Sequence, residues 1–158
     1  MQNTTTPKAT TTILKAWLIA GTLDICSAFI WAYLAKERMP QDVLMGISKF
    51  VVGSAFNEGL MIALGLLTHY LIAFCWTMIF FIAWPKVPLL QGDAILVGIL
   101  YGAVIWIVMN LGIRPLRMMA FPTYTIKGIA IDAGILMIAI GIPLSIIVGS
   151  YYRNKKVE

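Results

Sequence analysis

Long runs of apolar residues dominate the chain and are separated by short clusters of charged residues. A transmembrane helix needs about 20 mainly apolar residues to cross roughly 30 Å of hydrocarbon. Four runs meet this length, and their apolar positions are continuous rather than alternating, which favours helices over barrel strands. We therefore predict four membrane spans, at about residues 16–35, 59–84, 94–113 and 126–151.

The segment 40–57, between the first two predicted spans, has a different pattern. Its apolar residues fall on one helical face, and small or charged residues such as Lys49 fall on another. Pro40 suits the first turn of a helix, and Asp42 suits its positive end. An amphipathic helix that lies at the interface or re-enters the membrane fits this pattern better than the alternative, a fifth crossing.

The pattern thus predicts an all-α membrane protein, a four-transmembrane-helix bundle with an amphipathic interfacial or re-entrant helix between the first and second spans. One domain at 13–152 is flanked by a mobile polar tail at 1–12 and a short polar tail at 153–158. Four crossings place both termini on one side, here named side A, opposite side B. The 12 Lys and Arg divide equally between the two sides, and only the basic C-terminal cluster favours cytoplasmic termini.

Composition excludes several other classes of protein. Hydrophobic residues make up 60% of the chain and charged residues 12%, against roughly a quarter charged in a soluble domain. The mean hydropathy is +0.88. A soluble enzyme, a disordered regulator and a disulfide-built secreted domain are excluded. The net charge of +5 does not indicate nucleic acid, because the cations lie in short clusters between apolar runs. The expected partner is the lipid bilayer.

Small residues recur where the predicted spans should touch. Gly98 and Gly102 form a GxxxG pair in the third span, and Gly141 belongs to a stripe of small residues in the fourth. Close packing of helix backbones explains both features. We also expect Pro143 to kink the fourth helix, because a proline leaves the carbonyl of Ala139 without its usual partner.

Ionisable residues inside the predicted spans are the most informative feature, since each costs about 2.5–3.5 kcal/mol at the centre of a membrane helix. Asp24 and His69 lie at similar distances from the side B ends of the first two spans, so both map close to the midplane. An Asp–His hydrogen bond would fix the imidazole tautomer and lower the cost of burying both groups.

A second polar group maps towards side B and consists of Glu58, Asn110, Arg114 and Asp132. Together with Asp24 and His69, these residues would line a water-filled vestibule, the shape expected of a proton or ion pathway. The alternative is a set of structural pairs: Asp132 with Arg114, Glu58 with Arg117, and Asp24 with His69 or a serine. In either case we expect Arg114 within salt-bridge reach of Asp132 or Glu58. Spacing alone does not decide between a pathway and structural pairs.

No cofactor, metal-binding or catalytic residues are expected. The chain has one His, and its two Cys do not form a ligand-spaced cluster. Cys26 and Cys75 map to similar depth and suit packing better than a disulfide. A nucleophile elbow and a Gly-rich phosphate loop are both missing from the sequence.

Two stretches carry a resemblance to a known family. One runs from Thr68-His69-Tyr70 through the Trp84-Pro85-Lys86 turn to Gly92, and the other is 109–116 followed by Phe121-Pro122. They resemble the YagU-like family of bacterial inner-membrane proteins, in which a TH-containing helix ends at a Pro-Lys turn and a Gly-rich span leads into a Pro-rich loop. The resemblance covers roughly the middle third of the chain. It implies a bacterial inner membrane, while the family has no established biochemical activity.

Three functions remain open. The first is a small transport or permeation protein for a proton, an ion or a small solute; we expect it to be a homo-oligomer, because four helices make a thin bundle. The second is a non-transporting membrane subunit or scaffold whose polar residues pair internally. The third is an intramembrane enzyme acting on a lipid or quinone, with Asp24 and His69 as acid and base, but the chain lacks accompanying catalytic groups. We favour the first.

Overall fold

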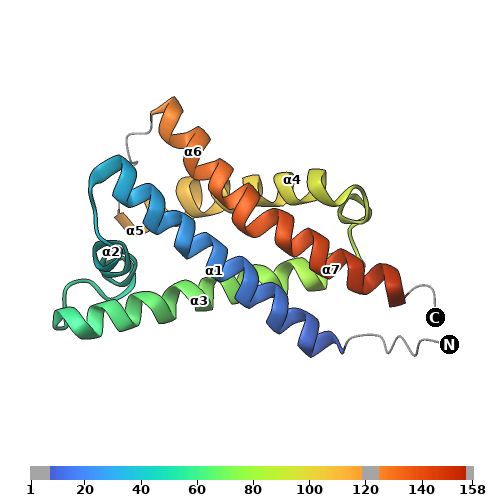
Figure 1. Cartoon of the computed structure of the whole chain (residues 1–158), viewed down its shortest axis with the longest axis horizontal. Coiled ribbons are helices and arrows are strands. Elements are labelled where there is room, and N and C mark those ends of the chain that lie inside the picture. Colours follow the sequence, from blue (N-terminus) through green and yellow to red (C-terminus); the bar gives the residue numbers. More distant parts are fainter. Residues whose placement is uncertain (1–7, 119–124, 156–158) are drawn as a thin grey trace.

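The computed structural model describes residues 8–118 and 125–155, except the side chains of residues 36, 117 and 118. Over these residues it is helical and contains no strand (Figure 1). The α-helices are α1 (Ala9–Lys36), α2 (Pro40–Val52), α3 (Glu58–Ala83), α4 (Ala94–Ile107), α5 (Arg114–Met118), α6 (Ile126–Leu136) and α7 (Ile142–Lys155). A 3-10 turn, η1 (Pro88–Gln91), and two π-helical stretches, η2 (Val108–Ile113) and η3 (Met137–Gly141), complete the chain order.

In the described part of the chain, four helical segments are long and apolar enough to cross a membrane, which agrees with the predicted number of such helices. They are Ala9–Ala35, Glu58–Ala83, Ala94–Leu116 and Ile126–Lys155. The first two correspond to α1 and α3, the third joins α4, η2 and the start of α5, and the fourth joins α6, η3 and α7. Each is longer than the 20 or so residues that a perpendicular crossing needs, so tilted crossings are expected.

The first helix begins earlier than the sequence pattern predicts. It starts at Ala9, inside the stretch 1–12 that was assigned to a polar tail. Thr12 is buried, and its hydroxyl donates to the carbonyl of Lys8 at 3.4 Å, which satisfies this polar side chain within the helix. A Thr-rich stretch is therefore helical here because local hydrogen bonds and burial offset its weak helix propensity.

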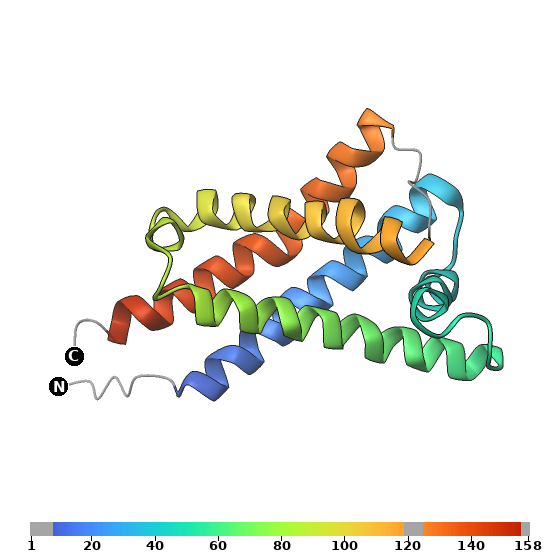
Figure 2. The same ribbon diagram turned by 180° about the vertical axis from the view of Figure 1, so that it is seen from behind.

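Helix α2 occupies most of the segment between the first two spans. Its 13 residues rise about 20 Å, too little to cross the hydrocarbon. Both views show α2 end-on, so its axis runs across the long helices (Figures 1 and 2). It lies against α3, where the backbone of Leu44 contacts Gly65 so closely that no Cβ would fit. The chain leaves α2 through Gly53, whose φ of +68° suits glycine.

The start of α1 and the end of α7 lie at the same end of the bundle, here named the termini end (Figure 1). Helix α2 lies at the opposite end, here named the α2 end. The long helices lie closer together at the termini end and spread apart towards the α2 end (Figure 2). The main apolar core includes Ala16 and Ala20 of α1, Phe80 of α3 and Leu144 of α7, so it holds the termini half together.

Glycines bring the third and fourth apolar segments into backbone contact, as the small-residue pattern predicts. A Cβ on Gly98 would lie 2.6 Å from the Cα of Ile142, and a Cβ on Gly102 would lie still closer to the backbone of Met137. Gly141 in turn contacts the backbone of Gly98. The GxxxG pair is therefore a packing motif between α4 and the η3–α7 region.

Candidate functional site

Helices α1 and α3 are joined by polar contacts around Gly21. A Cβ on this glycine would lie 3.2 Å from the Tyr70 ring and 3.3 Å from the Ala73 Cβ, so glycine lets the helices approach. The indole Nε1 of Trp17 donates to the carbonyl of Tyr70 at 2.7 Å. The Tyr70 hydroxyl lies 2.9 Å from the Thr22 hydroxyl. These contacts fix the register of the two helices.

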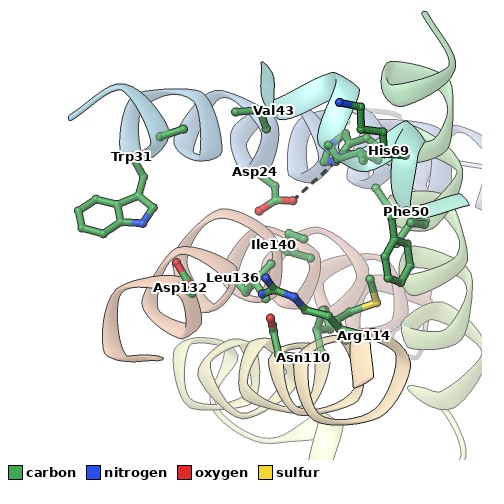
Figure 3. A pocket seen from close by; sticks show the side chains of 18 of the residues that line it. Asp24, Trp31, Val43, Phe50, His69, Asn110, Arg114, Asp132, Leu136 and Ile140 are labelled. Carbon is green, nitrogen blue, oxygen red and sulfur yellow. Dashed lines mark ion pairs between the residues drawn. The ribbon is translucent and has the colours of Figure 1, made fainter. Parts of the chain in front are cut away.

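That register brings together the two ionisable residues predicted to meet near the midplane. His69 is buried, and its Nε2 lies 2.8 Å from the carbonyl oxygen of Gly21. Its Nδ1 lies 4.0 Å from a carboxylate oxygen of Asp24, whose side chain is 17% exposed (Figure 3). The tautomer is therefore set by the Gly21 carbonyl, whereas the sequence analysis assigned that role to Asp24.

The exposed part of Asp24 faces a cavity of about 980 Å³. Residues from α1, α2, α3, α4, η2, α5, α6 and η3 line it, so nearly every helix of the bundle contributes to its wall. Its ionisable lining residues are three carboxylates (Asp24, Asp42 and Asp132), three cations (Arg38, Lys49 and Arg114) and His69. The remaining wall is largely apolar, which resembles the usual lining of small-molecule pockets.

Five of the six candidate polar residues predicted from the sequence line this one cavity: Asp24, His69, Asn110, Arg114 and Asp132. Glu58 does not line it. Its side chain is exposed in the first turn of α3, where the preceding Asn57 caps the helix by accepting from the Leu60 amide at 3.0 Å. The structure thus separates Glu58 from the other five.

Three further charged residues of the cavity were not predicted from the sequence: Arg38, Asp42 and Lys49. All three belong to α2 or the turn before it, a segment that the sequence pattern placed at the membrane interface. The charge clustering around 36–49 was the available signal. Their place in the cavity wall depends on α2 lying across α3 at Gly65, a tertiary contact that periodicity does not reveal.

The expected structural ion pair of Arg114 is not formed. Within residues 8–118 and 125–155, the recorded ion pair is the one between His69 and Asp24, and none joins Arg114 to Asp132 or Glu58. Arg114 instead extends into the cavity from the wall opposite Asp24 (Figure 3). The cation is therefore placed where a solute or water can reach it.

Two π-helical stretches border the cavity. Met109 and Asn110 of η2 and Ile140 of η3 all line it. The η3 stretch ends just before Pro143, so the disturbance expected from this proline takes the form of a π-helical stretch. Such stretches inside α-helices occur frequently at functional sites, because they shift which side chains face a given direction.

The cavity ends against the apolar core. Ile105 and Ile140 line it and belong to the same buried cluster as Ala20, Phe80 and Leu144. On α3 the cavity extends past His69 to Ala73 and Trp76, and towards the termini end it stops at this packed cluster. The bundle is thus packed at the termini end and contains the cavity towards the α2 end.

Cysteine and metal chemistry do not account for the cavity. Cys26 and Cys75 are free thiols, and both are exposed, which corrects their assignment as packing residues. In the part of the chain that the structure describes, no group of three or more His, Cys, Asp or Glu side chains is placed to hold a metal ion.

The outer surface is compatible with a polytopic membrane protein. Large apolar side chains are exposed along the long helices, among them Leu67 and Leu71 of α3 and Ile138 of η3. Soluble proteins rarely expose such continuous apolar surface. In comparisons with known proteins, no family model, no curated protein and no solved structure matches the chain. The resemblance to YagU-like proteins therefore stays a prediction.

Proposed function

We propose that the protein is a small transport protein of the bacterial inner membrane that moves protons, alone or with an ion or small solute, through the cavity. One observation carries this proposal: the cavity of about 980 Å³ reaches the buried Asp24–His69 pair and ends beyond it, against the apolar core. A space that is open to one side and closed towards the other is the arrangement expected of a transport half-pathway.

The alternative is a scaffold whose polar residues pair internally. Such pairing would surround each buried charge with hydrogen-bond partners and packed side chains. The charged lining residues border a space of about 980 Å³, near the upper end of the range for small-ligand pockets, about 300–1,000 Å³. A cavity of this size, with charged side chains in a largely apolar wall, is large enough for water or a small solute, which favours transport over a structural role.

The proposal places α2 at the side B interface. Arg38 and Lys49 lie at and near its ends, where they reach phosphate groups or water, and Val51 and Val52 expose apolar surface. The cavity then opens to side B beside α2, and the termini face the cytoplasm. Assembly into a homo-oligomer is part of the proposal, because a bundle of four helices is thin.

A flux assay tests the function. The purified full chain is reconstituted into vesicles that contain a pH-sensitive dye, and a pH gradient is imposed with the membrane potential clamped. We expect proton flux above that of protein-free vesicles, and we expect the Asp24→Asn variant to lose it. Asp24→Asn keeps the size of the side chain but removes the charge.

Asp93→Asn is the matched control, because Asp93 is exposed, lies outside the cavity and caps α4. Asparagine also caps helices, so this variant should transport like the unmodified chain. Equal permeability of protein-containing and protein-free vesicles to protons, Na⁺ and K⁺ would contradict the proposal and favour the scaffold.

A further inference from the structure

The hydrogen bond between His69 and Gly21 determines the protonation of one ring nitrogen. A carbonyl oxygen only accepts hydrogen bonds, so Nε2, at 2.8 Å from the Gly21 oxygen, must carry the hydrogen and donate. This holds for neutral imidazole and for imidazolium alike. A neutral His69 therefore has its hydrogen on Nε2 and an unprotonated Nδ1.

The other nitrogen faces a second acceptor. Nδ1 of neutral His69 and the ionised Asp24 carboxylate can only accept, yet they lie 4.0 Å apart. A single proton resolves this conflict, either as imidazolium beside carboxylate or as neutral imidazole beside the carboxylic acid. In the absence of that proton, a water molecule that donates to both atoms fits the separation.

We propose that Nδ1 of His69 and the carboxylate of Asp24 together bind one exchangeable proton, while Nε2 stays protonated on the Gly21 carbonyl throughout. The inference rests on the proposed function, and it names the proton as the species that the pair binds. Binding adds one positive charge to the pair: an O–H bond of hydronium in the cavity breaks, and an N–H bond on Nδ1 or an O–H bond on the Asp24 carboxylate forms. Proton exchange therefore changes the protonation of Nδ1 or of the Asp24 carboxyl and leaves Nε2 protonated.

The separate partners of Nε2 and Nδ1 have a structural consequence. Because the Nε2–Gly21 bond is the same in both states, the contact between α1 and α3 persists when the proton leaves. The change in charge is confined to the face of the pair that borders the cavity. Water or a solute in the cavity can then respond to the proton without separation of the two helices.

The charged groups around the pair accommodate the loss of the proton. Those that share its cavity are Asp42 and Lys49 of α2, Arg38 before α2, Arg114 of α5 and Asp132 of α6. On α3 itself, the Tyr70 ring contacts His69 edge to face. With Asp24 ionised and His69 neutral, three cations balance three carboxylates in the lining. With the proton bound, the lining carries one net positive charge, so neither state builds up a large local charge.

The experiment uses the chain's single histidine, which gives one set of imidazole signals after ¹⁵N-histidine labelling. In lipid nanodiscs, we expect the neutral form of His69 to show a protonated Nε2 and an unprotonated Nδ1. On acidification, Nδ1 should become protonated, or Asp24 should, while the Nε2 signal stays protonated. A neutral form with the hydrogen on Nδ1, or a rapid mixture of both tautomers, would overturn the proposal without any need for a variant.

Carboxyl variants supply the second arm. Asp24→Asn and Asp93→Asn each remove one titrating carboxyl, so the number of protons released does not distinguish them, but only Asp24 lies beside the imidazole. The proposal therefore also requires that ¹⁵N signals of His69 change in Asp24→Asn and not in Asp93→Asn. Unchanged His69 signals in both variants would contradict the pair.

The outcomes separate this inference from the transport proposal. If the predicted tautomer and the response to Asp24→Asn are found but no vesicle shows flux, the proton site stands and the transport function is wrong. If flux is found and requires Asp24, but neutral His69 carries its hydrogen on Nδ1, transport stands and the shared-proton site is wrong.

Discussion

At the scale of single residues, aromatic side chains with a polar tip connect the long helices to α3. The Tyr101 hydroxyl of α4 donates to the carbonyl of Trp76 at 2.7 Å, and the Tyr152 hydroxyl of α7 donates to that of Phe81 at 3.0 Å. Trp17 of α1 makes the equivalent bond to Tyr70. Each bond satisfies a polar tip in surroundings without bulk water.

The loss of one such tip should be measurable. Tyr101 is buried, so Tyr101→Phe removes its hydrogen bond to Trp76 and leaves the ring packing in place. Interhelical hydrogen bonds in membrane proteins average about 0.6 kcal/mol, with a maximum near 1.7 kcal/mol. We expect a loss of stability in this range, measured by unfolding in detergent. Tyr33→Phe, at a side chain that is 59% exposed, is the control and should be neutral.

The residue scale also shows which parts of the site the sequence could predict. Asp24 and His69 were identified because an ionisable group in an apolar run is costly and must find a partner at its own depth. The role of the Gly21 carbonyl was not identifiable, because every residue has a carbonyl and only the helix register selects one. Glu58 was grouped with the others although it does not line the cavity, because depth along a helix carries no information on the direction of its side chain.

At the scale of elements, backbone contact and irregular helix geometry occur together. The η3 stretch contacts α4 through Gly102 and Met137, and it also lines the cavity through Ile140. The same segment therefore packs against α4 in the termini half of the bundle and also lines the cavity. The glycines predicted the backbone contact and Pro143 predicted a disturbed helix, but neither predicted that this segment lines a cavity.

Paired glycine substitutions in the fourth apolar segment test this packing. A Cβ on Gly141 would collide with the backbone of Gly98, so Gly141→Ala should destabilise the bundle by about 1–3 kcal/mol, the usual range for overpacking. Gly134 has nothing within 4 Å of such a Cβ, so Gly134→Ala should be neutral or stabilising by up to about 1 kcal/mol.

Thermal unfolding of the two glycine variants in the same detergent gives the comparison. Equal stability of Gly141→Ala and Gly134→Ala would show that α4 and η3 are not in backbone contact in the membrane protein.

At the scale of the whole molecule, the four apolar runs were sufficient to predict the four long helices of the described residues, with the start of α1 and the end of α7 at the same end of the bundle. They were not sufficient to predict the cavity, because it arises where the helices spread apart and α2 lies across α3. The interior volume of a bundle depends on crossing angles, and these depend on side-chain packing rather than on apolar length.

The proposed orientation of the cavity makes the last prediction. Met109 is half-buried and lines the cavity from η2, so a thiol at this position would contact any water that fills the space. The background is a chain without cysteines, made with Cys26→Ala and Cys75→Ala at the two exposed thiols. Met109→Cys should react with a membrane-impermeant thiol reagent added at the α2 end, because only a hydrated thiol forms the reactive thiolate.

The same reagent added at the termini end should not react, since the apolar core separates that end from the cavity. Ile79→Cys is the control: Ile79 is half exposed on α3 but does not line the cavity, so the thiol would face lipid and stay unreactive from both ends. Reaction of Met109→Cys from the termini end alone, or from neither end, would contradict a hydrated cavity that opens beside α2. Reaction from the α2 end alone would show that water reaches the space bordered by the Asp24–His69 pair from one side of the membrane, as a half-pathway requires.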